Sequence, residues 1–191
     1  GMDAITQLIE SYISRKAQPV PQALAIDGLR AALPSIAEAV RQGDRLPPRQ
    51  RMAHAALLSG MALANSGLGM AHGVAPALGV HCRVPHGVAC ALMLPPALRV
   101  NRDAKLGELA HLARACDVVP PSAPADEAVD QFIERIERLC NEVGVARRLS
   151  QVGVRREQIP DIVASSRGSS MSGNPTDITD EQLTALLEEI W

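Results

Sequence analysis

The hydrophobic residues of this chain recur mainly at three- and four-residue spacing, the pattern of helices that bury one face. The first such face runs over about residues 3–14 and consists of Ile5, Leu8, Ile9, Tyr12 and Ile13. Similar spacing predicts further helices over about residues 21–41, 48–66, 70–78, 86–100, 105–116, 126–143 and 156–165. No segment alternates convincingly between apolar and polar residues, so we expect no β-sheet.

Helix-breaking and helix-capping residues separate these segments. Gly67-Leu68-Gly69 ends one predicted helix, and residues 118–124 and 166–175 are rich in Pro or in Ser and Gly, which is typical of loops. Thr179 followed by Gln182 has the spacing of a capping box, which predicts the start of the last helix. We therefore predict an all-α fold of about eight to ten helices, in a single domain spanning residues 1–191.

Charged residues are nearly absent from the middle of the chain. Between Met52 and Leu98 the only Asp, Glu, Lys or Arg is Arg83. A membrane-spanning helix needs roughly 18 or more continuous apolar residues, whereas histidine, proline and glycine interrupt this stretch every few positions. We expect no membrane span. Because burial of an unpaired charge is costly, we expect residues 52–98 to be the most buried part of the domain.

Composition and charge exclude further classes of protein. The net charge is −2 and the pI is about 6.2, which gives no support for binding nucleic acid. The four cysteines form no CxxC pair, and no secretory signal is evident, so we expect reduced thiols in a cytoplasmic protein. No glycine-rich loop lies between a strand and a helix, so the chain has no dinucleotide site of the Rossmann type.

Two histidines in the low-charge stretch are candidates for metal binding. His72 and His86 lie 14 positions apart, and a glycine follows each of them. Neutral imidazole is the commonest metal ligand in proteins, and a low-charge setting favours the neutral form. The alternative is two ordinary buried histidines that bond to backbone carbonyl groups. The spacing alone favours that alternative.

Asp3 and Gln7 are four residues apart and therefore share one face of the first predicted helix. Asp3 could supply an anionic ligand and Gln7 its amide oxygen, although an acidic residue in a first helical turn is also favoured simply by the helix dipole. His54, His81 and His111 belong to no recognisable constellation, so we expect structural or surface positions for them. The cysteines lack ligand spacing, and we expect them to be core thiols.

Three sequence strings, taken together and in order, resemble iron-containing alcohol dehydrogenases. They are GMDAITQLIESYIS at 1–14, GLGMAHG at 67–73 and VPHGVA at 84–89. In that family the first string carries an aspartate ligand and, one turn later, a histidine ligand, and the other two carry one histidine ligand each. The likeness runs over essentially the whole chain. It implies that Asp3, Gln7, His72 and His86 stand at the positions of a divalent metal site.

The resemblance also implies a fold and a function. The implied fold is the helical metal-binding domain of the dehydroquinate synthase-like and iron-containing alcohol dehydrogenase type, which in the family follows an α/β domain that binds NAD(P). The implied ion is usually Fe²⁺ and sometimes Zn²⁺. It would bind the oxygen of a small alcohol or aldehyde and polarise the carbon–oxygen bond for hydride transfer. Because the nucleotide-binding domain is absent here, we expect this chain alone to be inactive. An apolar surface left uncovered would favour a homo-oligomer.

The chain departs from the family pattern at two site positions. Gln7 stands where most members have histidine, and a neutral amide is a weaker ligand for iron or zinc than imidazole. Three strong ligands plus water would remain, an arrangement that also suits a catalytic zinc site. Pro76 stands where many members have a further histidine, often assigned to proton relay, and proline cannot relay a proton. The catalytic residues therefore stay unassigned.

Two other functions compete with the dehydrogenase. One is a metal-binding helical module without catalysis of its own, as a remnant or as a subunit that awaits a partner. The other is a lyase of the dehydroquinate-synthase type, which shares the two-domain architecture. A charged substrate of that kind would need basic residues around the site, and the segment around His72 and His86 offers only Arg83.

Overall fold

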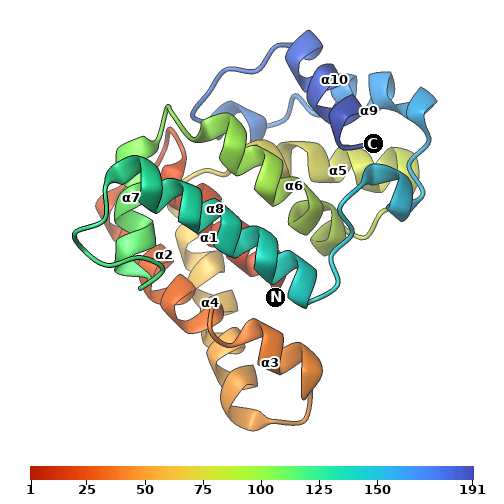
Figure 1. The fold of residues 1–191 in the computed structure, drawn as a ribbon. Helices are drawn as coiled ribbons and strands as arrows, with labels where there is room; N and C mark the ends of the chain where they lie inside the picture. The colour runs from red at the N-terminus through yellow and green to blue at the C-terminus, as the bar shows by residue number, and fades with distance from the viewer.

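The computed structural model describes residues 1–191 and consists of helices and loops without strands (Figure 1). Ten α-helices follow one another along the chain: α1 (Met2–Ile13), α2 (Pro19–Ala32), α3 (Ile36–Arg41), α4 (Leu46–Ala64), α5 (Met70–Cys82), α6 (His86–Asn101), α7 (Leu106–Ala115), α8 (Ala125–Glu142), α9 (Ile159–Ser165) and α10 (Asp180–Glu189). Three short 3₁₀ helices cover Leu149–Val152, Arg156–Gln158 and Met171–Gly173. The prediction of an all-α fold is confirmed.

The helices enclose two hydrophobic cores that meet at α6. The first core lies among α1, α2, α4, α7 and α8 and includes Leu29, Leu109 and the only phenylalanine, Phe132, all fully buried. The second lies among α5, α6, α9 and α10 and includes Met70 and Met93. Because α6 contributes side chains to both cores, it fixes the two groups of helices against each other.

Helix α1 is the most thoroughly buried element, and it positions the start of α5 and α6. It packs against α2, α4, α5 and α6, and ten of its residues are buried. Helices α5 and α6 form a hairpin joined by residues 83–85 (Figure 1). Arg83 ends α5 in the left-handed region, with φ of 58°, which turns the chain back towards α1. The first turns of α1, α5 and α6 therefore come together.

Several predicted boundaries differ from the structure. The predicted helix over 21–41 is two helices, α2 and α3, because Pro34 has no N–H group to continue the backbone ladder after Leu33. Helix α5 continues to Cys82 through Pro76, four residues beyond the predicted end at residue 78. Within the predicted loop 166–175, residues 171–173 form a 3₁₀ turn.

The capping box that was predicted for the last helix is confirmed. The side-chain oxygen of Thr179 accepts a hydrogen bond from the backbone N–H of Gln182 at 3.3 Å. In return, the amide oxygen of Gln182 accepts from the backbone N–H of Thr179 at 2.9 Å. These two bonds satisfy backbone N–H groups that the first turn of α10 cannot pair internally.

The prediction that residues 52–98 are the most buried part is wrong for α4. Residues 68–75 and 89–94 are all buried, as expected. On α4, however, Leu57 is 63% exposed and Met61 is 46% exposed, because only one side of this helix packs against α1 and α2. Figure 1 shows α3 and the beginning of α4 projecting from the rest of the molecule. None of the helices has the length and apolar character needed to cross a bilayer.

Adjacent leucines on α4 provide a matched test of this packing. Leu58 is 7% exposed in the first core, whereas Leu57 is 63% exposed. We expect Leu58→Ala to lower the free energy of unfolding by about 2–5 kcal/mol, because it removes buried methyl groups and leaves a cavity. Leu57→Ala should change it by no more than about 0.5 kcal/mol. Equal effects of the two substitutions in urea denaturation would contradict the placement of α4.

Candidate metal centre

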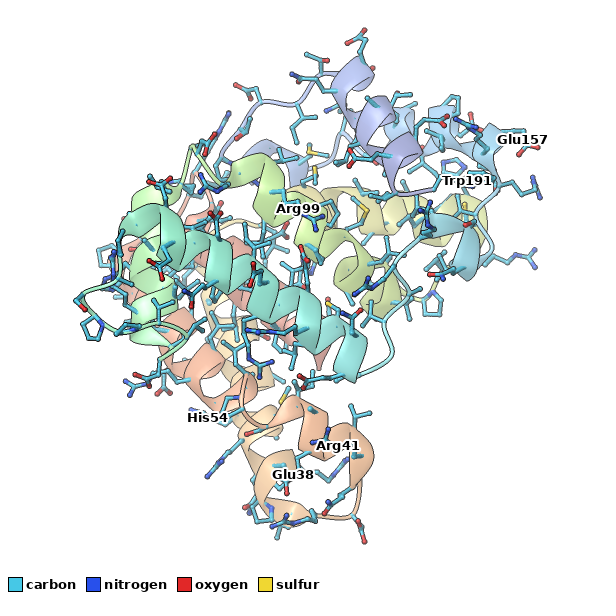
Figure 2. All side chains as sticks on the ribbon, in the orientation of Figure 1. Glu38, Arg41, His54, Arg99, Glu157 and Trp191 are labelled. Atoms are coloured by element: carbon cyan, nitrogen blue, oxygen red, sulfur yellow. The ribbon has the colours of Figure 1, made fainter.

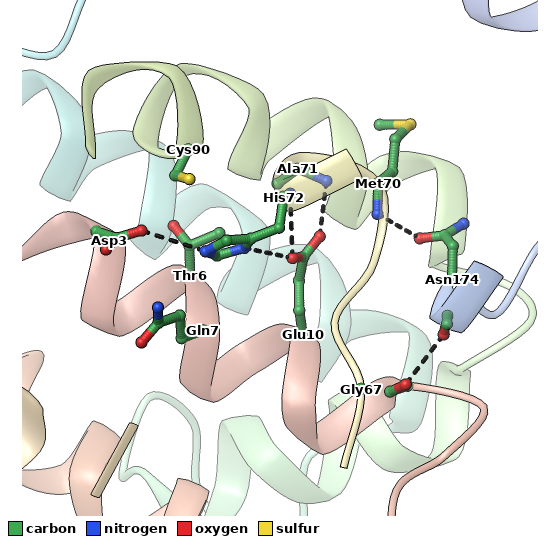
Figure 3. Close-up of polar contacts among 12 residues, drawn as sticks. Asp3, Thr6, Gln7, Glu10, Gly67, Met70, Ala71, His72, Cys90 and Asn174 are labelled. Atoms are coloured by element: carbon green, nitrogen blue, oxygen red, sulfur yellow. Dashed lines mark hydrogen bonds and ion pairs between the residues drawn. The ribbon is translucent and has the colours of Figure 1, made fainter. Parts of the chain in front are cut away.

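Four potential ligands converge where the first turns of α1, α5 and α6 meet, and Figure 3 shows Asp3, His72 and Cys90 among them. They are Asp3, His72, His86 and Cys90, and one ligand atom from each lies within 4.8 Å of all the others. Asp3 is in the first turn of α1, His72 in the first turn of α5 and His86 at the first position of α6. The structure thus brings together three of the four residues that the sequence indicated, from segments up to 83 positions apart.

The carboxylate of Asp3 lies between the two histidines. Its Oδ1 atom is 3.2 Å from Nε2 of His72 and 3.7 Å from Nε2 of His86. The two imidazole rings are tilted by 59° with their centroids 5.5 Å apart. These side chains therefore point towards a common region instead of bonding to backbone carbonyl groups, which argues against the interpretation as ordinary buried histidines.

Cys90 belongs to this cluster although the sequence interpretation placed it among the core thiols. Its Sγ atom is 3.5 Å from Nε2 of His86, and its side chain is fully buried. His86 and Cys90 are four residues apart on α6, so their side chains share one face of the helix. That spacing is the signal in the sequence that could have identified Cys90.

Gln7 lies one turn after Asp3 on α1, next to the cluster (Figure 3). Its amide oxygen accepts a hydrogen bond from the Ser59 hydroxyl at 2.9 Å. The Ser59 side chain also contacts the carbonyl oxygen of Ala56 at 2.8 Å, so it is anchored to α4. The single proton of the Ser59 hydroxyl is shared between these two oxygens, and it links the Gln7 amide to α4.

Glu10 holds His72 in place, and the sequence interpretation missed it. One Glu10 oxygen lies 2.7 Å from Nδ1 of His72, and the other accepts from the backbone N–H of Ala71 at 2.7 Å (Figure 3). Because Nδ1 donates to this carboxylate, Nε2 faces Asp3. Glu10 is 2% exposed and stands seven positions after Asp3, two turns along the same face of α1. The signal in the sequence that could have identified Glu10 was a carboxylate within an otherwise apolar helix face.

A tightly packed glycine fixes the start of α5, which carries His72. The side-chain oxygen of Asn174 accepts from the backbone N–H of Met70 at 3.0 Å. A Cβ atom on Gly69 would lie 2.9 Å from that oxygen and 2.9 Å from a Glu10 oxygen, closer than real Cβ atoms approach such atoms. Only glycine lets Glu10 and Asn174 approach the first N–H groups of α5 in this way.

The charges of the site are strongly coupled to one another. Burial alone would lower the pKa of His72, but its contacts with Asp3, Cys90 and Glu10 outweigh burial and raise it to about 11. The hydrogen bond with His72 is the main reason that the pKa of Asp3 is lowered. Burial raises the pKa of the Cys90 thiol to about 11. The carboxylates of Asp3 and Glu10 therefore face His72 from opposite ring nitrogens, and a divalent cation bound in the cluster would compensate part of their negative charge.

One side of the cluster opens on a mainly apolar cleft of about 680 Å³. The side chain of His86 is 52% exposed and that of Asp3 is 33% exposed, whereas His72 is 4% exposed. Asp3 itself lines the cleft together with Met2, Ile36, Met52, Gly87 and Val88. The cluster therefore has a buried side at His72 and an accessible side at His86 and Asp3.

The remaining histidines lie outside the cluster, as expected. His54 is at the surface, with Nε2 2.8 Å from a carboxylate oxygen of Asp27 (Figure 2). His81 lies 2.8 Å from the hydroxyl of Ser165, and His111 stacks on the Tyr12 ring. The other three cysteines, Cys82, Cys116 and Cys140, are unpaired and also lie outside the cluster.

The donor set fits a divalent first-row transition metal. It combines a carboxylate, two imidazoles and a thiol, and these groups bind zinc or iron more readily than they bind magnesium or calcium, which prefer oxygen ligands alone. Glu10 supplies the outer-shell carboxylate that commonly fixes a ligating histidine.

Comparison with known proteins gives one consistent result. The model of the Fe-containing alcohol dehydrogenase family, C-terminal part, matches residues 1–191. The chain is 34% identical over 191 residues to 1,3-propanediol dehydrogenase of Klebsiella pneumoniae, covering 99% of this chain and 49% of that protein. It is 33% identical to lactaldehyde reductase of Escherichia coli, covering 100% of this chain and 50% of the relative.

Solved structures agree with these sequence relatives. A crystal structure of 1,3-propanediol oxidoreductase superposes with a TM-score of 0.95 at 31% identity, covering 100% of this chain and 50% of the other. An alcohol dehydrogenase from Oenococcus oeni gives a TM-score of 0.94 at 30% identity, again over the whole of this chain and 50% of the other. The chain spans about half the length of the curated relatives it matches.

Proposed function

The chain belongs to the iron-containing alcohol dehydrogenase family, and from this premise we propose that it is the metal- and substrate-binding half of an oxidoreductase. In the proposed reaction, hydride passes between a small alcohol or aldehyde and NAD(P). The single observation that carries the proposal is the convergence of Asp3, His72 and His86 at the edge of an apolar cleft. We propose these three residues as metal ligands, with Gln7 beside them as a weak ligand or as the residue that holds a water molecule.

Different residues of this chain have different roles at the site. Glu10 orients His72 through its Nδ1 atom, and Asp3 supplies negative charge beside both imidazoles. The apolar walls of the cleft, including Met52 and Val88, would pack against the carbon chain of the substrate and exclude water from it. When bound, Fe²⁺ or Zn²⁺ supplies Lewis-acid chemistry that stabilises an alkoxide and polarises a carbonyl group. Pro76 provides no proton relay.

The relatives suggest the size of the substrate and the need for another domain. Three relatives that are 31–34% identical to this chain are named for 1,3-propanediol, lactaldehyde and 1-propanol, which are all three-carbon compounds. We propose a short alcohol or aldehyde of this class for the present chain. We propose that the nicotinamide nucleotide is held mainly by residues beyond these 191, since the relatives are about twice as long. Four free cysteines favour a reducing compartment such as the cytoplasm.

Binding of a short alcohol to the metal-loaded chain tests this proposal directly. The chain is loaded with paramagnetic Co²⁺ or with diamagnetic Zn²⁺, and the proton line widths of 1-propanol are measured by NMR. We expect the protons next to the hydroxyl group to broaden with Co²⁺ and not with Zn²⁺, because the alcohol oxygen would lie beside the ion. The same Co²⁺ sample made from His86→Ala should lose the broadening. Equal line widths with both metals in the unmodified chain would contradict the proposed substrate site.

A further inference from the structure

We propose that Cys90 is a fourth protein ligand of the metal, completing a set of one carboxylate, two imidazoles and one thiolate. This inference rests on the proposed function in one respect, because it assumes that Asp3, His72 and His86 bind the ion. Its independent support is the position of Cys90. The thiol is fully buried, lies on the same face of α6 as His86 and belongs to the group of ligand atoms that are within 4.8 Å of one another.

Three of the six distances between ligand atoms are close to those around a tetrahedral ion, and all six are within 4.8 Å. With ordinary zinc bond lengths, two nitrogen or oxygen ligands of a tetrahedron are about 3.3 Å apart, and a sulfur and a nitrogen ligand are about 3.6 Å apart. The Asp3 oxygen lies 3.2 Å and 3.7 Å from the nitrogens of His72 and His86. The Cys90 sulfur lies 3.5 Å from the His86 nitrogen. These three distances are compatible with a single ion that is bound by all four side chains.

Cys90 is a better fourth donor than Gln7. The amide oxygen of Gln7 accepts a hydrogen bond from Ser59, which is itself anchored to the backbone of α4. To bind the ion, Gln7 would have to break that bond and supply a neutral oxygen to a metal that favours nitrogen and sulfur. Cys90 would have to give up its contact with Nε2 of His86 and lose its proton, but the thiolate that it then supplies is a stronger donor for zinc or iron than a neutral amide oxygen.

The position of Cys90 leaves the substrate side of the ion free. Cys90 and His72 lie on the buried side of the cluster, whereas His86 and Asp3 face solvent and Asp3 lines the cleft. A substrate oxygen that enters from the cleft would be a fifth ligand, and zinc in catalytic sites expands to five-coordination. The four-ligand set is therefore compatible with substrate binding.

A thiolate ligand also changes which metal the site prefers. A thiolate is softer than an imidazole or an amide oxygen, and thiolates select zinc over the harder divalent ions. We therefore expect this chain to bind Zn²⁺ and Co²⁺ more tightly than Fe²⁺, with Cys90 as the source of part of that preference.

Visible and near-ultraviolet spectroscopy of the Co²⁺-loaded chain tests the inference. A cysteine ligand gives an intense sulfur-to-cobalt charge-transfer band in the near ultraviolet, whereas the weaker visible bands report any tetrahedral or five-coordinate cobalt. We expect the charge-transfer band and the visible bands in the unmodified chain. Cys90→Ser should lose the charge-transfer band, keep the visible bands and bind Zn²⁺ at least about tenfold more weakly. Cys140→Ser, which changes another buried thiol outside the cluster, should keep both sets of bands.

These measurements separate failure of the Cys90 proposal from failure of the proposed three-ligand site. Visible cobalt bands without a charge-transfer band in the unmodified chain would overturn the role of Cys90 and leave the three-ligand site standing. The absence of all cobalt bands would overturn both proposals. X-ray absorption of the Zn²⁺-loaded, unmodified chain does not depend on the folding of any variant. One sulfur neighbour of the zinc at about 2.3 Å supports the inference. A shell of nitrogen and oxygen neighbours alone contradicts it.

Discussion

The 191-residue chain alone is expected to leave NAD(P) unreduced when short alcohols and Fe²⁺ or Zn²⁺ are supplied. The same chain, joined behind a nucleotide-binding domain of this family, is expected to reduce it. Hydride transfer requires the nicotinamide and the alcohol carbon to be held in near-attack geometry, which can account for about 7–11 kcal/mol of the barrier. This chain offers the metal cluster and the cleft, but its sequence has no dinucleotide-binding loop, and its relatives are about twice as long.

Absorbance of the reduced nicotinamide in the near ultraviolet measures this difference. The joined protein should lose its activity on treatment with a chelator and regain it with added metal. Its His86→Ala form should stay inactive under both conditions, whereas His54→Ala, which changes a surface histidine outside the cluster, should behave like the parent. Metal-dependent turnover by the separate 191-residue chain, abolished by His86→Ala, would contradict the division of labour proposed here.

The second prediction with a large expected effect is that replacement of His72 by alanine abolishes tight metal binding. His72 is the only histidine of the cluster that is buried, and it contacts both Asp3 and Glu10. We expect His72→Ala to weaken binding of Zn²⁺ by more than about 100-fold, because changes to outer-shell partners alone already weaken metal sites by about 10–100-fold. The substitution also leaves Asp3 and Glu10 without the imidazole that lies between them.

Competition with a colorimetric chelator measures the affinity. His54→Ala is the matched control, because His54 pairs with Asp27 on the surface and should leave the affinity unchanged. Circular dichroism of each variant checks that the helices are intact. An unchanged affinity in a correctly folded His72→Ala protein would show that the ion binds elsewhere.

Local sequence signals predicted the helices well and failed where packing decides. The periodic apolar face of α1 and the capping box of α10 are properties of adjacent residues, and both are confirmed. The burial of α4 depends on which neighbours cover it. The lack of charged residues over 52–64 suggested a buried helix, but only one side of α4 meets α1 and α2. Pro34 was a local signal that the predicted helix over 21–41 should have taken into account.

The candidate site was predictable in part, for a similar reason. Spacing alone left His72 and His86 ambiguous, and the resemblance to a family resolved them together with Asp3. Glu10 contacts His72 across 62 positions of sequence, a pairing that no local pattern encodes. Cys90 is different, because its four-residue distance from His86 was readable along α6. Spacing among the cysteines alone contains no ligand pair, and Cys90 becomes a candidate only when its distance from His86 is considered.

Gln7 shows the limit of carrying a family role over to a single position. Its place one turn after Asp3 fits the position of a family ligand, yet its oxygen accepts a hydrogen bond from Ser59. The alternative donor comes from α6, a helix about 80 residues further along the chain. Three-dimensional proximity was needed to recognise that alternative.

Location of the ion by anomalous X-ray diffraction tests the central claim most directly. Crystals of the chain loaded with one equivalent of Zn²⁺ would be measured on both sides of the zinc absorption edge. The account predicts a single strong anomalous peak between the first turns of α1, α5 and α6, within bonding distance of Asp3, His72 and His86. A stoichiometrically loaded crystal with its anomalous peak elsewhere, and none among these three residues, would contradict it.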